Sequence, residues 1–294
     1  MEVALNGGTY SYVLVIELTG EPPQPRVQSE TLEFDGKRIL DLDSGRAKVY
    51  NEAFELVTLP LRLTSERSAL AAFGQNIENR TLKQFIQWIE GLLSCRINPF
   101  AMKETAEGEV RHPEVDLSNV AAWYRYLDGS HPYDVPKLRE SLSSAIEDFK
   151  SLRLEPREGT IERLVAEFSQ NTAARFRFTF SELSDGQRSL ICLYIILHFT
   201  IAKGRTVIID EPENFITLPE IQPWLTAVTD SVEEGNGQVF LISHHPELIN
   251  QWAPSHGVQF VRDGIGAVRV EPFHGDPDST LPPAELVARG WERG

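Results

Sequence analysis

Two adjacent carboxylates follow a short, mostly apolar run. The run is Thr-Val-Ile-Ile at residues 206–209, and Asp210 and Glu211 come directly after it. Such a run is typical of a strand buried in a parallel sheet, and open parallel sheets bind ligands at the carboxyl ends of their strands. There Asp210 could hold Mg²⁺, and Glu211 could orient and deprotonate a water for attack on a phosphoryl group. A solvated strand end would also place two acids here, so this motif alone leaves both interpretations open.

A second candidate site is the turn that opens a predicted helix over residues 183–203. Ser184, Gly186 and Gln187 belong to this turn, within the run Ser-Glu-Leu-Ser-Asp-Gly-Gln-Arg. Ser184 is a good N-cap, Gly186 permits a close approach of the backbone, and the free N–H groups of a helix N-terminus attract anions. A well-capped helix that binds no ligand is the alternative.

A histidine follows the next predicted strand, at residues 238–242. His244 is the second residue of the run Ser-His-His-Pro. At the carboxyl end of that strand it could contact a γ-phosphate or the attacking water. The alternative is a loop histidine that is merely solvated.

The elements that would position these motifs alternate between helix and strand. Strands at 206–209 and 238–242 flank a predicted helix at 219–233, and a unit of these lengths makes a parallel pair with a right-handed crossover. Because parallel strands end at the same sheet edge, we expect the acid pair and His244 to share that edge. Residues 258–261 and 268–270 are expected to form a closing hairpin.

The pattern of residues divides the chain into four parts, within an α/β fold. Residues 1–75 alternate as in an antiparallel β part, and residues 76–155 are predicted to form a helical lobe. Residues 156–275 form the core that carries the three motifs. Residues 276–294 form a turn-rich C-terminal tail.

Local signals mark individual elements in the first two parts. Asn6-Gly7-Gly8 is a hairpin turn signal before a strand. Asn79 is the expected N-cap of a helix whose apolar residues run as far as Leu93, and Pro136 fits the first turn of a later helix that extends to Phe149.

Composition limits the classes of function. The 294-residue chain is 41% hydrophobic and carries a formal net charge of −15. A surface this acidic repels phosphate backbones, so any involvement of DNA is expected to be indirect or to need a local basic patch. Arg175 and Arg177 alternate along one predicted strand and could form a basic stripe, although a solvated strand face is the favoured interpretation.

The chain shows no signal for export or for a membrane. Its most apolar stretch, residues 190–201, is about a dozen residues long, whereas a membrane-spanning helix needs roughly 20. The N-terminus lacks the basic region followed by an apolar core that a signal peptide has. Cys95 and Cys192 lack the spacing of a disulfide framework or a zinc site. We therefore expect a cytoplasmic protein without membrane contact.

Taken together, the three motifs resemble the signature motif, Walker B motif and switch histidine of ABC-type ATPases. The three motif sequences are similar to those of the RecF/SMC-like group: Ser-Asp-Gly-Gln, Asp-Glu-Pro-Glu-Asn and Ser-His-His-Pro-Glu-Leu. The resemblance implies an ABC-type P-loop NTPase head with an antiparallel β lobe, a helical lobe and a mostly parallel core sheet. Family members often read Leu-His-Pro after the acidic cluster, where this chain has Ile216-Thr217-Leu218.

The resemblance also implies a role for each site residue. Asp210 would serve Mg²⁺, Glu211 would be the catalytic base, and His244 would sense the γ-phosphate. The cofactors would be ATP and Mg²⁺, held in a homodimer or against a partner protein. Three residues would contact ATP bound by a second subunit: Ser184, Gly186 and Gln187.

A P-loop is missing from this sequence. It needs Gly, four residues, then Gly-Lys-Ser/Thr, so that backbone N–H groups and the lysine cradle the phosphates. The only Gly-Lys pair is Gly36-Lys37, with Thr31 and Arg38 at the other motif positions. We expect an N-terminally incomplete head, or a relative completed by another chain. A non-hydrolysing scaffold protein is the alternative function.

Overall fold

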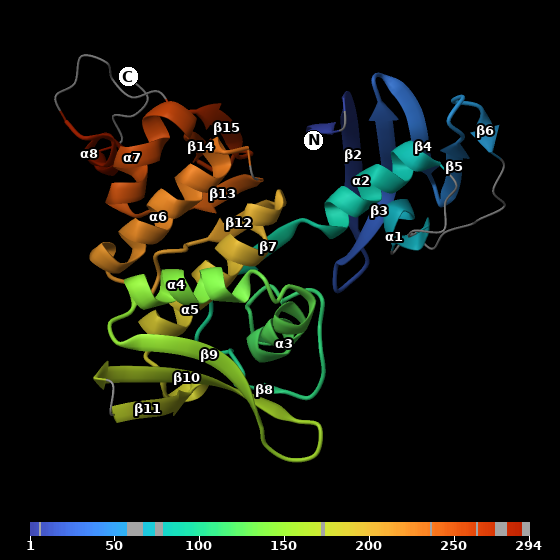
Figure 1. Ribbon diagram of the computed structural model, residues 1–294. Coiled ribbons are helices and arrows are strands. Elements are labelled where there is room, and N and C mark those ends of the chain that lie inside the picture. The colour runs from blue at the N-terminus through green and yellow to red at the C-terminus, as the bar shows by residue number, and fades with distance from the viewer. Residues whose placement is uncertain are drawn as a thin grey trace. The chain divides into compact units, whose positions relative to one another are not determined.

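The computed structural model divides the chain into two compact units, Met1–Leu92 and Leu93–Gly294 (Figure 1). The structure describes residues 1–5, 7–57, 67–73, 79–171, 174–235, 237–262, 264–273 and 281–289. Each unit has its own cluster of buried apolar side chains.

The first unit contains an antiparallel sheet in which each strand pairs with the next along the chain. The hairpin predicted at residues 6–8 is confirmed, because Leu5 pairs with Gly8 across the turn and Gly7 has a φ of +86°. Asn6 itself lies outside the described residues. The strands are β1 (Glu2–Leu5), β2 (Gly8–Thr19), β3 (Gln24–Phe34), β4 (Lys37–Asp43), β5 (Arg46–Tyr50) and β6 (Leu56–Val57).

Helix α2 (Arg80–Glu90) lies across this sheet, and the short helix α1 (Ala69–Phe73) completes the unit (Figure 1). Asn79 caps α2 as predicted, since its side-chain oxygen accepts a hydrogen bond from the Leu82 amide at 2.9 Å. Phe85 is fully buried in the same cluster as Tyr10 of the sheet. The division therefore falls after Leu92 rather than after residue 75, because α2 shares its apolar face with the sheet and not with the helices that follow.

The second unit begins with a strand that the sequence analysis missed. Leu93 belongs to β7 (Leu93–Arg96) and not to a helix, because α2 ends at its C-cap Gly91. Helix α4 (Val135–Ala145) has Pro136 in its first turn as predicted, but it stops before Phe149. Asp148, with a φ of +61°, turns the chain there into a strand.

An antiparallel sheet and two helices form the middle of this unit. Strand β10 pairs with β11, with β9 and with the short β8. The elements are β8 (Thr105–Ala106), α3 (Val120–Ser130), α4, β9 (Phe149–Pro156), β10 (Glu162–Asn171) and β11 (Ala174–Thr179).

The predicted strand–helix–strand unit is confirmed. β12 (Thr206–Asp210), α6 (Leu218–Glu233) and β13 (Gln238–Ile242) follow one another, and the two strands pair in parallel. β7 pairs in parallel with the other side of β12, so the sheet order is β13-β12-β7. The remaining elements are η1 (Phe180–Glu182), α5 (Asp185–Phe199), η2 (Ile201–Lys203), α7 (Pro246–His256), β14 (Val258–Val261), β15 (Arg269–Pro272) and α8 (Pro283–Arg289).

Burial differs between the two parallel strands β12 and β13. Helix α5 is buried almost all round, and Trp224 of α6 donates a hydrogen bond from Nε1 to the carbonyl of Leu193 at 2.9 Å. β12 is mostly buried, as expected for a parallel strand. β13, one of the two edge strands of the described sheet, departs from that expectation, since Phe240 and Ile242 on one of its faces are 48% and 49% exposed. The predicted closing hairpin is confirmed as the antiparallel pair β14–β15.

Candidate functional site

The acid pair lies at the carboxyl end of β12, as predicted. The side chains of Asp210 and Glu211 are 41% and 28% exposed, so both remain accessible to a ligand. The Glu211 amide donates a hydrogen bond to the carbonyl of Ile242 at 2.7 Å. Glu211 also has a φ of +49°, an uncommon conformation for a residue other than glycine. The backbone thus turns sharply after β12 and is tied to the end of β13.

Arg96 is a residue of this site that the sequence analysis missed. It ends β7 directly opposite Asp210 in the parallel register. Its Nε lies 3.8 Å from Oδ2 of Asp210, and its Nη2 lies 3.1 Å from Oε2 of Glu211. The sequence signal that could have found it is the alternation of apolar and polar residues in the run Leu-Ser-Cys-Arg at 93–96. In the structure Leu93 and Cys95 are buried, and Ser94 and Arg96 are exposed.

The loop after β12 is held by polar contacts on both sides. Asn214 Nδ2 donates a hydrogen bond to Oε2 of Glu211 at 2.7 Å. Ser243 Oγ donates to Oε1 of Glu213, and it accepts a hydrogen bond from the His245 amide at 2.9 Å. Glu213 therefore connects the acidic loop to the histidine loop at the end of the neighbouring strand.

The two histidines of that loop differ in their surroundings. His245 is the N-cap of α7, and its Nδ1 accepts a hydrogen bond from the Glu247 amide at 3.2 Å. His244 is exposed, two residues beyond the end of β13. The structure thus places His244 at the same sheet edge as the acid pair, while His245 serves the fold of the helix.

The N-terminus of α5 has the capped geometry expected from the sequence. Ser184 Oγ accepts a hydrogen bond from the Gln187 amide at 3.2 Å, and Gln187 Oε1 accepts one from the Ser184 amide at 3.1 Å. Ser184 is exposed at the surface. The close approach expected of Gly186 is made to the acidic loop, because a Cβ at this position would lie 2.8 Å from the carbonyl oxygen of Phe215. Helix α5 and the loop after β12 therefore touch through their backbones.

Glu104 anchors the turn that leads into α5. Its carboxylate accepts hydrogen bonds from the Ser181 amide, at 3.3 Å, and from Ser181 Oγ. Burial raises the pKa of Glu104, but hydrogen bonds from Ser181 and Thr179 outweigh burial and hold the pKa below its ordinary value. A charged Glu104 thus fixes the approach to Ser184.

The donor set at the sheet edge fits a shared Mg²⁺ site. Among the residues that the structure describes, no group of three or more His, Cys, Asp or Glu side chains could hold a metal alone. Mg²⁺ is commonly bound by one or two carboxylates together with the phosphates of its substrate. Asp210 would supply a carboxylate of such a site, and waters or the phosphates of a nucleotide would supply the other oxygens.

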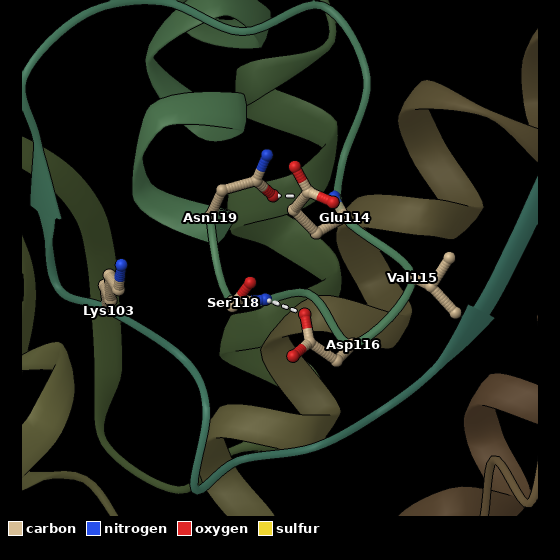
Figure 2. A pocket seen from close by; sticks show the side chains of 6 residues that line it. All are labelled: Lys103, Glu114, Val115, Asp116, Ser118 and Asn119. Carbon is tan, nitrogen blue, oxygen red and sulfur yellow. Dashed lines mark hydrogen bonds between the residues drawn. The ribbon is translucent and has the colours of Figure 1, made fainter. Parts of the chain in front are cut away.

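A polar pocket of about 530 Å³ lies in the loop before α3 (Figure 2). The Ser118 amide donates to Oδ1 of Asp116 at 2.9 Å, and the Glu114 amide donates to Oδ1 of Asn119 at 2.8 Å. Two backbone amides of this loop are thus bonded to side chains of the same loop.

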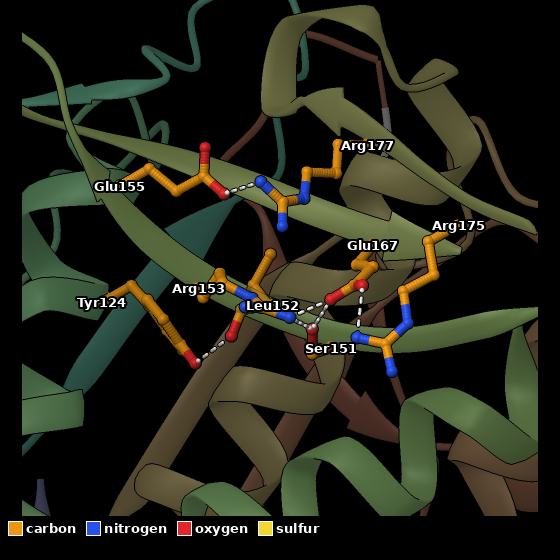
Figure 3. Close-up of polar contacts among 8 residues, drawn as sticks. All are labelled: Tyr124, Ser151, Leu152, Arg153, Glu155, Glu167, Arg175 and Arg177. Atoms are coloured by element: carbon orange, nitrogen blue, oxygen red, sulfur yellow. Dashed lines mark hydrogen bonds and ion pairs between the residues drawn. The ribbon is translucent and has the colours of Figure 1, made fainter. Parts of the chain in front are cut away.

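The predicted arginine stripe is present on the β9–β10–β11 sheet, but its charges are paired (Figure 3). Glu167 is only 3% exposed and forms ion pairs with Arg153 and with Arg175, the latter at 3.3 Å. Arg177 pairs with Glu155 at 3.4 Å. Cross-strand pairing of this kind favours a solvated, charge-balanced face over a site for a phosphate backbone.

Comparison with protein families gives a match to part of this chain. Residues 107–250 match the family described as "AAA domain, putative AbiEii toxin, Type IV TA system". The match covers just under half of the chain and includes the turn at the start of α5, the acid pair and His244. This segment is therefore similar to AAA-type ATPase domains. A comparison with curated protein sequences gives no match.

Solved structures that overlap with part of the chain include the following two. One is the SMC head domain with a coiled coil and joint from Pyrococcus yayanosii, with 17% identity and a TM-score of 0.38; the overlap covers 60% of this chain and 31% of that one. The other comes from work on ATP-driven dimerization and DNA-stimulated activation of SMC ATPases, with 17% identity and a TM-score of 0.35; it covers 56% of this chain and 95% of that one. Within the described ranges, no helix has the length and apolar character needed to cross a membrane.

Proposed function

We propose that this chain is an ATP-binding and hydrolysing subunit of an ABC-type, RecF/SMC-like ATPase. ATP would be held between two copies, or between this chain and a partner protein, and its hydrolysis would drive a change in the assembly. The observation that carries the proposal is the acid pair at the carboxyl end of β12, with His244 at the end of the adjacent strand. The AAA-type match over residues 107–250 supports it.

The chemistry assigned to each residue follows from its position. Bound Mg²⁺ would neutralise charge on the phosphates, and Asp210 is its proposed ligand. Glu211 lies within the same edge and is proposed to take a proton from the attacking water. Asn214 and Arg96 both contact Oε2 of Glu211, which fixes the orientation of its carboxylate. His244 is proposed to contact the γ-phosphate.

The second half of the site is proposed to come from the N-terminus of α5. Ser184 is exposed at that end, and the free N–H groups there favour an anion. Ser184, Gly186 and Gln187 of one copy would contact the triphosphate held by the other. The contact between Gly186 and the carbonyl of Phe215 supports a coupling between the two half-sites of one copy.

The only Gly-Lys pair of the sequence does not form a P-loop. Gly36 and Lys37 form the turn between β3 and β4, where Gly36 has a φ of +74° and the Lys37 ammonium lies 4.6 Å from the centre of the Phe54 ring. This hairpin does not have the strand–loop–helix context of a P-loop. We propose that a segment outside this sequence, or another chain, supplies that loop.

Two measurements test the proposal. The 294-residue chain alone should bind MgATP with a Kd weaker than about 1 mM, measured by titration calorimetry. Turnover of ATP by the pure chain would contradict the P-loop argument.

In an assembly that includes a P-loop segment, Glu211→Gln should lower kcat by about 10²- to 10⁴-fold while ATP still binds. The variant should also accumulate a nucleotide-bound dimer in size-exclusion chromatography. Glu155→Gln is the matched control, because Glu155 is a surface carboxylate on β9 paired only with Arg177 among the described contacts. Unchanged hydrolysis in Glu211→Gln would overturn the role of Glu211 as the catalytic base. No hydrolysis by the unsubstituted assembly would favour a scaffold protein that keeps the fold without the reaction.

A further inference from the structure

One cationic side chain faces both carboxylates of the proposed site. Arg96 forms ion pairs with Asp210 and with Glu211, and no other Lys or Arg of the described residues forms an ion pair with either. The parallel register sets this contact, because Arg96 and Asp210 are direct partners at the ends of β7 and β12. The pairing is thus built into the sheet rather than made by a loop.

The ion pairs of Arg96 with the two carboxylates are exposed enough for other contacts to replace them. The Arg96 side chain is 62% exposed, and ion pairs in such surroundings contribute little to stability. Glu211 would keep a partner without Arg96, because Asn214 Nδ2 lies 2.7 Å from the same Oε2. Loss of the arginine would therefore remove charge from the site without releasing the Glu211 side chain.

We propose that Arg96 is a positioning residue that occupies the place of the divalent cation in the nucleotide-free chain. A guanidinium has only donors, so it cannot share a metal's coordination, and it competes with the metal for the carboxylate oxygens. With Mg²⁺ and the triphosphate bound, Asp210 would hold the metal, and the guanidinium of Arg96 would turn to the phosphate oxygens, for which it has a matching planar fork. This inference rests on the proposed role of Asp210 as a metal ligand.

The test uses Mn²⁺ as the probe, because it prefers the same oxygen ligands and is visible by electron paramagnetic resonance. In the nucleotide-free chain, Arg96→Gln should tighten Mn²⁺ binding by about two- to fivefold, the range expected for removing one exposed ion pair. Arg96→Lys keeps a positive charge and should fall between Arg96→Gln and the unsubstituted chain.

The matched control is Arg38→Gln in the first unit. Arg38 also pairs with two carboxylates, Glu33 at 3.4 Å and Asp41 at 3.2 Å. Arg38→Gln therefore changes the net charge by the same amount as Arg96→Gln, but at a position distant in the sequence. This control should leave Mn²⁺ affinity within the experimental error. Equal tightening in Arg38→Gln and Arg96→Gln would overturn the inference, because it would reduce the effect to overall charge.

Asp210→Asn separates this inference from the proposed function. Loss of Mn²⁺ binding in Asp210→Asn, together with tighter binding in Arg96→Gln, supports both. Loss in Asp210→Asn with unchanged or weaker binding in Arg96→Gln overturns the role of Arg96 alone. Mn²⁺ binding that is absent throughout, or that Asp210→Asn does not alter, would count against the metal site itself.

Discussion

Gly186 lies so close to the carbonyl of Phe215 that no side chain fits between the start of α5 and the acidic loop. A Cβ added at Gly186 would lie 2.8 Å from that oxygen, which belongs to the backbone and not to a flexible side chain. Phe215 already has a φ of +70°, an uncommon conformation for a residue other than glycine. The glycine is therefore required by packing within the chain, whatever it contacts in a second copy.

Gly186→Ala should destabilise the protein for this reason. We expect a loss of about 1 to 3 kcal/mol in the free energy of unfolding, as for other overpacked sites, measured by urea denaturation of the second unit. Gly129→Ala in α3 is the control, because nothing lies within 4 Å of its added Cβ and alanine favours a helix. A Gly186→Ala variant as stable as Gly129→Ala would show that the two backbones can separate without cost.

At the scale of elements, hydrogen bonds to the charged side chain of Glu104 connect the start of the short strand β8 to the turn η1. Glu104 precedes β8 and accepts hydrogen bonds from Ser181 in η1, the turn that leads into α5. Its pKa lies below the ordinary value of 4.5, because the hydrogen bonds from Ser181 and Thr179 outweigh the effect of burial. A group with a lowered pKa in the folded state stabilises the fold above its unfolded pKa, and this contribution is lost as the pH falls through the folded pKa.

Glu104→Gln should reveal that contribution as a pH-dependent difference. Near neutral pH the variant should be less stable by about 1 kcal/mol, allowing for partial exposure of the carboxylate. At about pH 4 and below, the difference should shrink as Glu104 becomes protonated in the unsubstituted protein. Urea denaturation of both proteins across this range checks the prediction, and a difference that does not depend on pH would contradict it.

The elements near the site could be predicted wherever their signals are local. β12 and β13 are short apolar runs, and Asn79 and Ser184 are caps whose side chains bond to the amide three residues on. The place of Arg96 could not be predicted in this way. β7 has four residues and comes two residues after α2, and only its pairing with β12 shows that it belongs to the core sheet.

At the scale of the whole molecule, the sequence pattern identified the antiparallel β part but ended it at residue 75, before α2, whereas the first compact unit extends to Leu92. Amphipathic spacing shows that α2 has an apolar face, but it does not show which sheet receives that face. The structure shows it, since Leu82, Phe85 and Ile86 are buried with the side chains of the first sheet. The roles of the site residues in catalysis stay predictions, because they depend on the proposed second half-site.

The separate cores predict that the two units unfold separately. Phe85→Ala should destabilise the first unit by about 3 to 5 kcal/mol, because it removes a fully buried ring from that cluster. In hydrogen exchange followed by mass spectrometry, peptides from residues 1–92 should exchange faster, whereas peptides around Trp224 should change little. Equal acceleration throughout the chain would mean that the units unfold as one.

The exposed apolar side chains of β13 have a consequence for handling the protein. Phe240 and Ile242 face solvent on an edge strand of the described sheet, and an uncovered edge presents unpaired backbone groups to any other strand it meets. Concentrated solutions of this chain should therefore aggregate through strand-to-strand pairing, and a charged substitution such as Phe240→Lys should improve solubility.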